Sequence, residues 1–379
     1  MNVLQFYRTY LPESHGGVEE AIRQICIATG QHGVRHRVLT LARVSSKEVI
    51  ERPEATVIRA PLQWEPASCS MGSSLFRLYR EHAEWADVIQ IHYPWPFADL
   101  VHLLSGVRKP VVVTYHSDIV RQGWLEKLYQ PLRKRFFRRV SAVVATSPNY
   151  LDSSTFLQRV RDKCTTIPLG LCPESYPAPS AAAQRSIKER FGSGYFLFVG
   201  VLRYYKGLDV LVDAAARNGL QVVIAGKGPE EANLRARVKQ RGVGNVHFAG
   251  FVSDDEKAAL FQSCRAVVFP SFLRSEAFGV TLLEGLLYGK PLISCDIGTG
   301  TTFVNVDQQT GLVVPPRDSM AMAMAMRLLH EDHQLAVEMG QRGRERFDAV
   351  FSGDKVGSAY ADLYSTIVKQ ESERFQEAP

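Results

Sequence analysis

The sequence predicts an α/β protein built from two doubly wound parallel sheets, which form two facing domains with a cleft between them. Short runs rich in Val and Ile alternate with longer amphipathic segments along most of the chain, a pattern typical of buried parallel strands joined by helices. The Pro-, Ser- and Ala-rich stretch at 173–184 interrupts this alternation once. A length of 379 residues suits two domains.

Each predicted strand is a short β-branched or aromatic run, and each predicted helix shows apolar residues at helical spacing. The predicted strands are Val3–Tyr7, His36–Leu41, Thr56–Ala60, Val88–Ile91, Val111–Tyr115, Ala142–Thr146, Tyr195–Val199, Gln221–Ala225, Val246–Phe248, Ala266–Pro270, Pro291–Cys295 and Gly311–Val314. The predicted helices are Val18–His32, Ser73–Trp85, Leu125–Val140, Tyr150–Leu157, Leu208–Arg217, Pro229–Arg241, Asp254–Ser263, Val280–Leu287, Met320–His330 and 355–370.

These elements predict an N-terminal domain over 1–172, a linker over 173–193, a second domain over 194–354 and a C-terminal helix over 355–379 that packs back across the hinge. Ligands of such sheets bind at the carboxyl ends of the strands, so the cleft is the expected site.

Composition excludes several classes of protein. With 45% hydrophobic and 22% charged residues, the chain is neither disordered nor fibrous. Its net charge of +6 fits an anionic partner but is too small to indicate nucleic acid. The cysteines lack CxxC spacing, and the histidines lack metal-ligand spacing, so we expect neither a metal nor a redox site. No signal peptide and no apolar run of about 18 residues is evident, which predicts a cytoplasmic protein.

Two acids lie eight positions apart in the segment that follows the strand ending at Pro270. Glu276 is in the loop, and Glu284 is one turn into the next helix. Between them, the backbone N–H groups of Phe278, Gly279 and Val280 stand at a helix N-terminus, where an anion binds well. Sugar hydroxyls would suit the two acids. Alternatively, Glu276 caps the helix and Glu284 is a solvated surface acid.

Two cations, Arg203 and Lys206, lie in the Gly-containing turn after the strand at 195–199. Cations at a strand end suit a diphosphate, although a solvated basic loop is the alternative interpretation. The P-loop pattern and the GxSxG pattern are absent, and both GxGxxG candidates are incomplete.

Taken together, these motifs resemble glycosyltransferase family 4, whose members are retaining enzymes of the GT-B fold that use nucleotide sugars. The resemblance covers nearly the whole chain. It rests on Glu276 and Glu284 with Phe278-Gly279 between them, on Lys206-Gly207 and on the Gly226-Lys-Gly228-Pro229 run. It also includes Gly16-Gly17, His116 and Ser147.

The resemblance implies a role for each matching residue. Glu284 would bind the ribose, Glu276 the donor sugar, and Lys206 the diphosphate, with Gly226 and the backbone at Phe278, Gly279 and Val280 lining the donor site. The family arginine position holds Val201 here, and we infer that Arg203, two residues later, replaces it. Gly16 and Gly17 would let backbone approach the phosphates, unless they only form a turn. His116 would lie near the donor sugar, its alternative being a packing or capping role. No bound metal ion is implied.

The segment after Gly250 resembles the base pocket of the family's mannosyltransferases. There, backbone at Val252, the acid Asp254 and Lys257 would meet guanine, since an acid accepts from the N1–H and amine while a lysine donates to O6. The alternative is a helix start with a Ser253–Glu256 capping box. The resemblance therefore favours a GDP-sugar over a UDP-sugar.

The segments CDIGTGTTFVN at 295–305 and TGLVVPP at 310–316 look like those of bacterial enzymes that add mannose or D-rhamnose to lipopolysaccharide O-chains, which implies a lipid-linked saccharide acceptor. A basic helix with two Phe residues would hold the protein on the inner face of an anionic membrane, unless its basic face is only solvated. Its cations are Arg133, Lys134, Arg135, Arg138 and Arg139. Trp95 could stack on an acceptor sugar or anchor its loop. The rival functions are a nucleotide-sugar 2-epimerase and a non-catalytic nucleotide-sugar binder.

Overall fold

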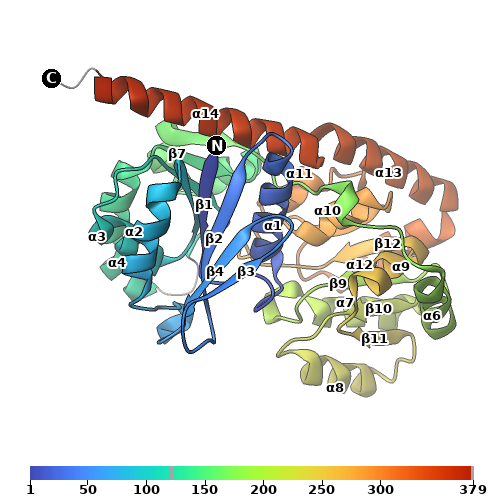
Figure 1. Cartoon of the computed structure of the whole chain (residues 1–379). Coiled ribbons are helices and arrows are strands. Elements are labelled where there is room, and N and C mark those ends of the chain that lie inside the picture. Colours follow the sequence, from blue (N-terminus) through green and yellow to red (C-terminus); the bar gives the residue numbers. More distant parts are fainter. Residues whose placement is uncertain (120–122, 377–379) are drawn as a thin grey trace. The chain divides into compact units, whose positions relative to one another are not determined.

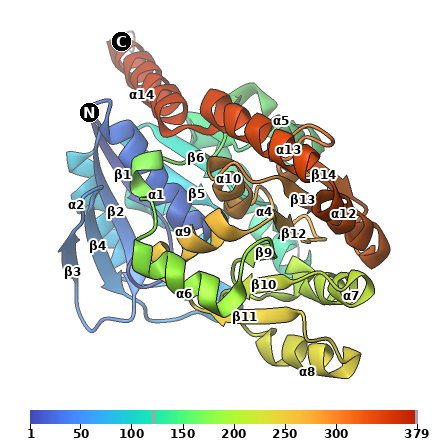
Figure 2. The ribbon, with the colours of Figure 1, turned by 90° about the vertical axis from the view of Figure 1, so that its right-hand side faces the viewer.

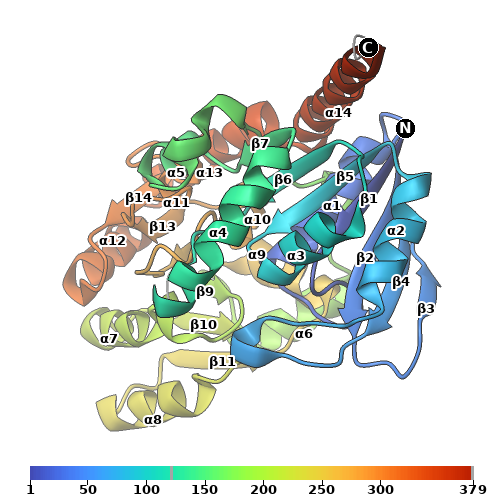
Figure 3. The same ribbon diagram turned by 90° about the vertical axis from the view of Figure 1, so that its left-hand side faces the viewer.

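The computed structural model describes residues 1–119 and 123–376, which form two compact units. The first unit contains residues 1–170 together with the chain's last helix from 353, and the second contains residues 171–352. The break therefore falls two residues before the expected one. Figure 1 labels the elements, and Figures 2 and 3 show them from two further sides.

The first unit is an eight-stranded sheet of order β3-β4-β2-β1-β5-β6-β7-β8. Its strands are β1 (Asn2–Phe6), β2 (Arg35–Ala42), β3 (Glu48–Glu51), β4 (Thr56–Pro61), β5 (Val88–Tyr93), β6 (Val111–Tyr115), β7 (Ala142–Ala145) and β8 (Cys164–Thr166). All pairs are parallel except β3 with β4. The strand order reverses at β1, where Val3 lies between His36 and Val88.

Helices cover this sheet in two groups. They are α1 (Gly17–Gly30), α2 (Leu75–Trp85), α3 (Pro96–Ser105), α4 (Gly123–Arg139), α5 (Pro148–Ser153) and α14 (Gly353–Gln376). The helices α1 and α14 pack against each other, and α3 packs against both α2 and α4. One apolar cluster joins Val3, Val88 and Val112 of the sheet to Ile25 of α1 and Tyr360 of α14, so the last helix is part of this unit's core.

The second unit is a six-stranded, wholly parallel sheet of order β11-β10-β9-β12-β13-β14. Its strands are β9 (Phe196–Val199), β10 (Val222–Ala225), β11 (Val246–Gly250), β12 (Ala266–Phe269), β13 (Leu292–Cys295) and β14 (Gly311–Val314). In order of appearance this is 3-2-1-4-5-6, the Rossmann arrangement, whose ligands bind where the order reverses. Here that point lies between β9 and β12.

Eight helices accompany this sheet in residues 171–352, all of which are described: α6 (Ala181–Phe191), α7 (Leu208–Asn218), α8 (Glu231–Arg241), α9 (Asp254–Ser263), α10 (Val280–Leu287), α11 (Thr301–Val304), α12 (Ser319–Glu331) and α13 (His333–Arg346). The expected linker over 173–193 is wrong in its second half, because α6 occupies it and packs against α9. Ser180 caps α6 by accepting a hydrogen bond from the backbone of Ala183. No helix in the described chain is long and apolar enough to cross a membrane.

Candidate active site

The reversal point of the second sheet brings together two residues that the sequence predicts separately. Lys206 follows β9 in a short 3₁₀ turn (Tyr204–Lys206), Glu276 follows β12, and the lysine ammonium donates to the glutamate carboxylate. Each of these side chains is only 12% exposed. Lys206, predicted to bind the diphosphate, and Glu276, predicted to bind the donor sugar, are thus neighbours in one site.

The Lys206–Glu276 pair forms because the turn after β9 and the loop after β12 lie in close contact. Gly207 has a φ of +66°, and a Cβ there would lie 2.1 Å from the carbonyl oxygen of Pro270. Only glycine permits that contact between the turn after β9 and the loop after β12. The ammonium of Lys206 also lies 4.7 Å from the ring centroid of Phe269, where a cation is attracted to the aromatic face.

Further hydrogen bonds, which the sequence does not predict, fix the Glu276 loop. Ser271 donates from its Oγ to the Glu276 carboxylate at 3.2 Å, and Thr299 donates to the Glu276 carbonyl at 2.9 Å. The backbone N–H of Gly300 donates to the Ala277 carbonyl at 2.8 Å. The Gly-Thr-Gly-Thr run at 298–301 therefore supports the loop that carries Glu276.

The helix α10 begins beside this loop. Phe278 is buried, Gly279 is the N-cap, and Val280 is the first residue of the helix. Their backbone N–H groups donate to no other group in residues 1–119 and 123–376. Unpaired N–H groups at a helix N-terminus are suited to an anion or a sugar hydroxyl.

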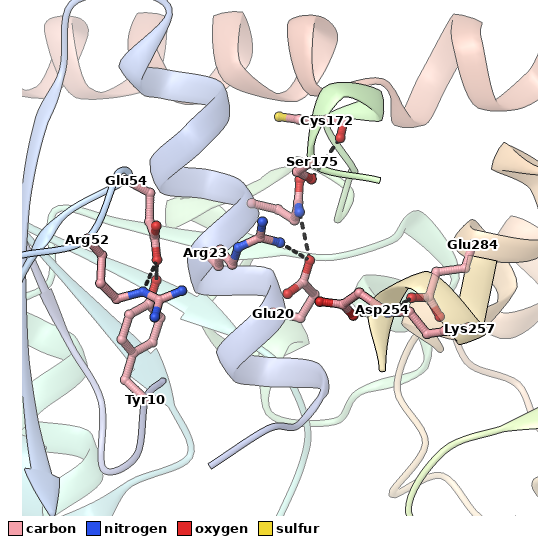
Figure 4. Close-up of polar contacts among 11 residues, drawn as sticks. Tyr10, Glu20, Arg23, Arg52, Glu54, Cys172, Ser175, Asp254, Lys257 and Glu284 are labelled. Atoms are coloured by element: carbon pink, nitrogen blue, oxygen red, sulfur yellow. Dashed lines mark hydrogen bonds and ion pairs between the residues drawn. The ribbon is translucent and has the colours of Figure 1, made fainter. Parts of the chain in front are cut away.

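A second ion pair connects α9 with α10 (Figure 4). Lys257 Nζ lies 2.9 Å from Glu284 Oε1 and 3.3 Å from Asp254 Oδ1. Glu284 is 5% exposed, so the interpretation as a solvated surface acid is wrong, whereas Asp254 is exposed. The role predicted for Lys257 at guanine stays a prediction. The structure shows this lysine paired with the carboxylate that is predicted to bind the ribose.

The start of α9 also contains the alternative that the sequence offered. Ser253 and Glu256 form a complete capping box, with the Ser253 side chain accepting from the Glu256 backbone and the Glu256 carboxylate accepting in return. Val252, just before it, is half-buried. The capping box and a base-binding role involve different atoms and are compatible.

The glycine of the GxGP run has a packing role. A Cβ at Gly226 would lie 2.0 Å from the carbonyl oxygen of Gly200, and one at Gly228 would lie 2.5 Å from that of Leu202. Gly226 therefore lets the loops after β9 and β10 touch. Arg203, in the first of these loops, is exposed.

The other predicted site residues belong to the first unit. Gly16 is the N-cap of α1, with extended backbone, and Gly17 begins the helix and is exposed. His116 follows β6 and is 7% exposed, and its ring stacks on that of His92 with centroids 5.2 Å apart. Burial lowers the pKa of His116 to about 4, so the ring is neutral at pH 7.

The basic helix α4 differs from the expectation in two ways. Arg133 is buried, with its guanidinium 4.3 Å from the ring centroid of Phe156, and it does not belong to a surface patch. Phe136 and Phe137 are also buried and unavailable to a bilayer. The cations that remain exposed are Lys134, Arg135, Arg138 and Arg139.

Trp95 is 1% exposed and donates from Nε1 to the Ser70 carbonyl at 2.9 Å, so it anchors its loop. Trp64, which the sequence analysis missed, is 59% exposed. It follows β4 and lines a hollow of about 380 Å³ whose other walls are Arg43, Val44, Leu62, Gln63 and Glu65. The exposure of Trp64 could not be predicted from the sequence. It depends on the pairing of β2 with β4, which brings the residues after these two strands together.

Comparisons with known proteins agree with this architecture. The Glycosyl transferases group 1 model matches residues 181–346, and the Glycosyl transferase 4-like domain matches residues 16–170. D-rhamnosyltransferase WbpZ of Pseudomonas aeruginosa is 48% identical over 352 residues, which cover 93% of this chain and 92% of the relative. O-antigen chain mannosyltransferase C of Escherichia coli is 43% identical over 372 residues, which cover 98% and 100%.

Among solved structures, sucrose-phosphate synthase from Thermosynechococcus elongatus superposes with a TM-score of 0.78 at 23% identity, covering 97% of this chain and 99% of that one. At that identity the likeness shows the GT-B fold alone. The two domain matches and the two relatives show the family. The chain therefore belongs to the family 4, group 1 glycosyltransferases and is itself a glycosyltransferase of GT-B fold.

Proposed function

We propose that this glycosyltransferase transfers D-rhamnose or mannose from a GDP-sugar to a lipid-linked saccharide during O-antigen synthesis, with retention of the anomeric configuration. The names of the two relatives support the sugar and the pathway. The observation that carries the site is the Lys206–Glu276 pair at the reversal point of the second sheet, beside unpaired N–H groups of α10.

The charges of the side chains indicate which part of the nucleotide-sugar donor each residue binds. Lys206 carries three N–H donors, of which Glu276 uses one, so the ammonium can also meet a phosphate oxygen. Arg203 adds an exposed guanidinium from the same turn. Glu276 accepts from hydroxyls of the donor sugar, Glu284 from those of the ribose, and Asp254 from guanine. The partial positive charge at the start of α10 favours the same diphosphate.

The reaction breaks the bond between the sugar C1 and the diphosphate oxygen, and it forms a bond from C1 to the acceptor oxygen on the same face. The acceptor's proton passes to the leaving phosphate oxygen. Negative charge grows on the diphosphate in the transition state, and Lys206, Arg203 and the α10 N–H groups stabilise it. No protein nucleophile is required.

The acceptor side rests on the first unit. A sugar ring packs well against an exposed indole, and Trp64 offers one in a hollow that Arg43 and Glu65 also line. The exposed cations of α4 attract anionic lipid. Because Phe136 and Phe137 are buried, this attraction is electrostatic, and salt should abolish flotation of the protein with anionic liposomes.

A donor-and-product assay tests the proposal. The full chain is incubated with GDP-D-rhamnose, GDP-mannose or UDP-glucose, with and without a synthetic lipid-linked saccharide. We expect acceptor-dependent GDP release and a product whose anomeric configuration, read by NMR, equals that of the donor. An inverted product contradicts retention, preference for UDP-glucose contradicts the GDP assignment, and epimerised donor without GDP release contradicts transfer.

A further inference from the structure

A continuous row of buried polar side chains crosses the sheet of the first unit and ends at His116. Every member is at most 7% exposed. In spatial order they are Thr29 of α1, His36 of β2, Gln5 of β1, His92 of β5 and His116 after β6. Neighbours are joined by contacts of 2.6, 3.3, 2.8 and 2.9 Å, respectively. Apart from His116, none of these residues has yet been given a role.

The contact between Thr29 and His36 sets the direction of every hydrogen bond in the row, because the Thr29 hydroxyl can only accept from His36. Thr29 donates its single hydroxyl proton to the Ile25 carbonyl at 2.6 Å. The hydroxyl can then only accept from His36, so His36 must carry its proton on Nε2. Its Nδ1 is consequently bare and accepts from Gln5, which must present its amide nitrogen there.

The direction of the remaining hydrogen bonds, from Gln5 to His116, follows in the same way. With its nitrogen toward His36, Gln5 presents Oε1 to His92 Nε2, which must therefore be protonated. The Nδ1 of His92 is then bare and faces His116 Nε2 at 2.9 Å. His116 must donate from Nε2, which leaves its own Nδ1 with a lone pair and no proton.

The assignment of one proton to each ring requires that His36, His92 and His116 be neutral, and burial makes them so. It lowers the pKa of His36 to about 3 and that of His116 to about 4, and it places the pKa of His92 well below its usual range. Each ring therefore carries one proton at neutral pH, and the row has a single consistent arrangement.

A branch of the network agrees with this orientation of Gln5 and couples it to the orientation of Gln90. The amide nitrogen of Gln5 also donates to Gln90 Oε1 at 3.0 Å, and the Gln90 amide donates to Thr114 Oγ1 at 2.6 Å. Tyr364 of α14 donates to the same Gln90 oxygen. Rotating the Gln5 amide alone would bring two carbonyl oxygens together, a buried contact with no hydrogen bond.

We propose that Thr29, His36, Gln5 and His92 are positioning residues that hold His116 in its Nε2–H form, so that its Nδ1 is a hydrogen-bond acceptor. Such a nitrogen accepts from a sugar hydroxyl and repels a phosphate oxygen, so His116 recognises the donor's sugar and not its diphosphate. This last step rests on the proposed function, whereas the protonation pattern of the histidines does not.

The experiment reads that pattern directly. The full chain is labelled with ¹⁵N-histidine, and two-bond ¹H–¹⁵N correlations at pH 7 distinguish the Nε2–H form, the Nδ1–H form and the cation. Signals are assigned with His116→Asn and His92→Asn. We expect the Nε2–H form for His36, His92 and His116. An Nδ1–H or a cationic His116 in the wild-type chain overturns the proposal.

Threonine variants test the anchor. Thr29→Val removes the acceptor for His36, so the Gln5 and Gln90 amides, which cannot turn singly, become free to turn together. His92 and His116 should then become mixtures of two forms, and Thr29→Ser should restore one form. Thr40→Val is the matched control, because the buried Thr40 hydroxyl has no hydrogen-bond partner in the described chain. Unchanged histidine signals in Thr29→Val would refute the anchor, provided that thermal unfolding shows a folded protein.

A transfer assay tests the functional step separately. Turnover of Thr29→Val should fall about fivefold, equivalent to one hydrogen bond of about 1 kcal/mol, with Thr29→Ser and Thr40→Val close to wild type. If the NMR pattern holds and turnover is unchanged, His116 does not contact the sugar. If the wild-type chain has no transferase activity, the proposed function fails while the NMR result on the row remains decisive.

Discussion

Removing the ammonium of Lys206 should lower both the unfolding free energy and kcat. A second substitution, at Glu276, should restore the unfolding free energy but not kcat. In Lys206→Met, the Glu276 carboxylate, 12% exposed, keeps a hydrogen bond from Ser271 at 3.2 Å and no other within residues 1–119 and 123–376. A nearly buried charge left without its counter-ion costs about 3 kcal/mol of unfolding free energy. The double variant Lys206→Met/Glu276→Gln removes the stranded charge and should recover most of that loss.

Turnover should respond differently. Loss of one group that stabilises transition-state charge lowers kcat by about 100-fold, and the double variant should remain at least as impaired because it lacks both ligands. Urea unfolding gives the free energies, and GDP release at saturating acceptor gives kcat. Arg235→Met is the control, since its pair with Glu231 is exposed and contributes under about 1 kcal/mol.

Recovery of turnover together with stability in the double variant would refute the catalytic role of Lys206. The pair would then be purely structural, and the diphosphate would have to be bound elsewhere. An unchanged unfolding free energy in Lys206→Met would instead show that the ion pair is too solvated to matter. Each outcome identifies which part of the reasoning fails.

Four other predictions concern both units. Because burial lowers the pKa of His116 to about 4, against about 6.5 in the unfolded chain, its contribution to the unfolding free energy should be constant above pH 6.5 and fall by about 3 kcal/mol toward pH 4; a flat urea-unfolding profile over that range would contradict this. Glu284→Gln should weaken GDP binding about tenfold by calorimetry, as expected for a lost charged hydrogen bond; unchanged affinity would remove Glu284 from the ribose. Trp64→Ala should raise the KM for the acceptor about fivefold and spare the donor KM. Gly226→Ala, whose methyl would lie 2.0 Å from the Gly200 carbonyl, should lower unfolding free energy by about 3 kcal/mol, whereas Gly244→Ala, with open space around it, should not.

The sequence predicted the buried strands well because their signal is local. The run at 111–115 and the run at 311–314 form strands with the expected bounds. In the missed elements that signal is weak or is masked by residues typical of loops. The edge strand β3 has a single half-buried residue. The helix α3 does bury residues at helical spacing, but it follows directly on the prolines at 94 and 96, which are typical of a loop. In α6, the Ala and Ser residues predict a linker, although Ser180 is an N-cap before three alanines.

Pairing between distant residues was beyond the sequence. Lys206 and Glu276 were each predicted as ligands, but their ion pair depends on the loop contact at Gly207, 63 residues from Pro270. The role predicted for Lys257 at guanine O6 could not anticipate its pair with Glu284, which depends on how α9 and α10 pack. Arg133 resembles its basic neighbours in the sequence, and only its tertiary position, with the guanidinium over the Phe156 ring, shows that it is buried.

The discontinuous first unit sets an order of events during synthesis. Residues 171–352 form a contiguous unit, which can close as soon as it leaves the ribosome. The first unit cannot, since Tyr360 and Tyr364 of its core follow the whole second unit in the sequence. Until α14 emerges, the cluster around Val3, Val88 and Val112 lacks its Tyr360 and Tyr364 side chains, and Gln90 lacks its bond from Tyr364. The nascent chain therefore passes through a stage in which its second unit is folded and its first unit is still unfinished.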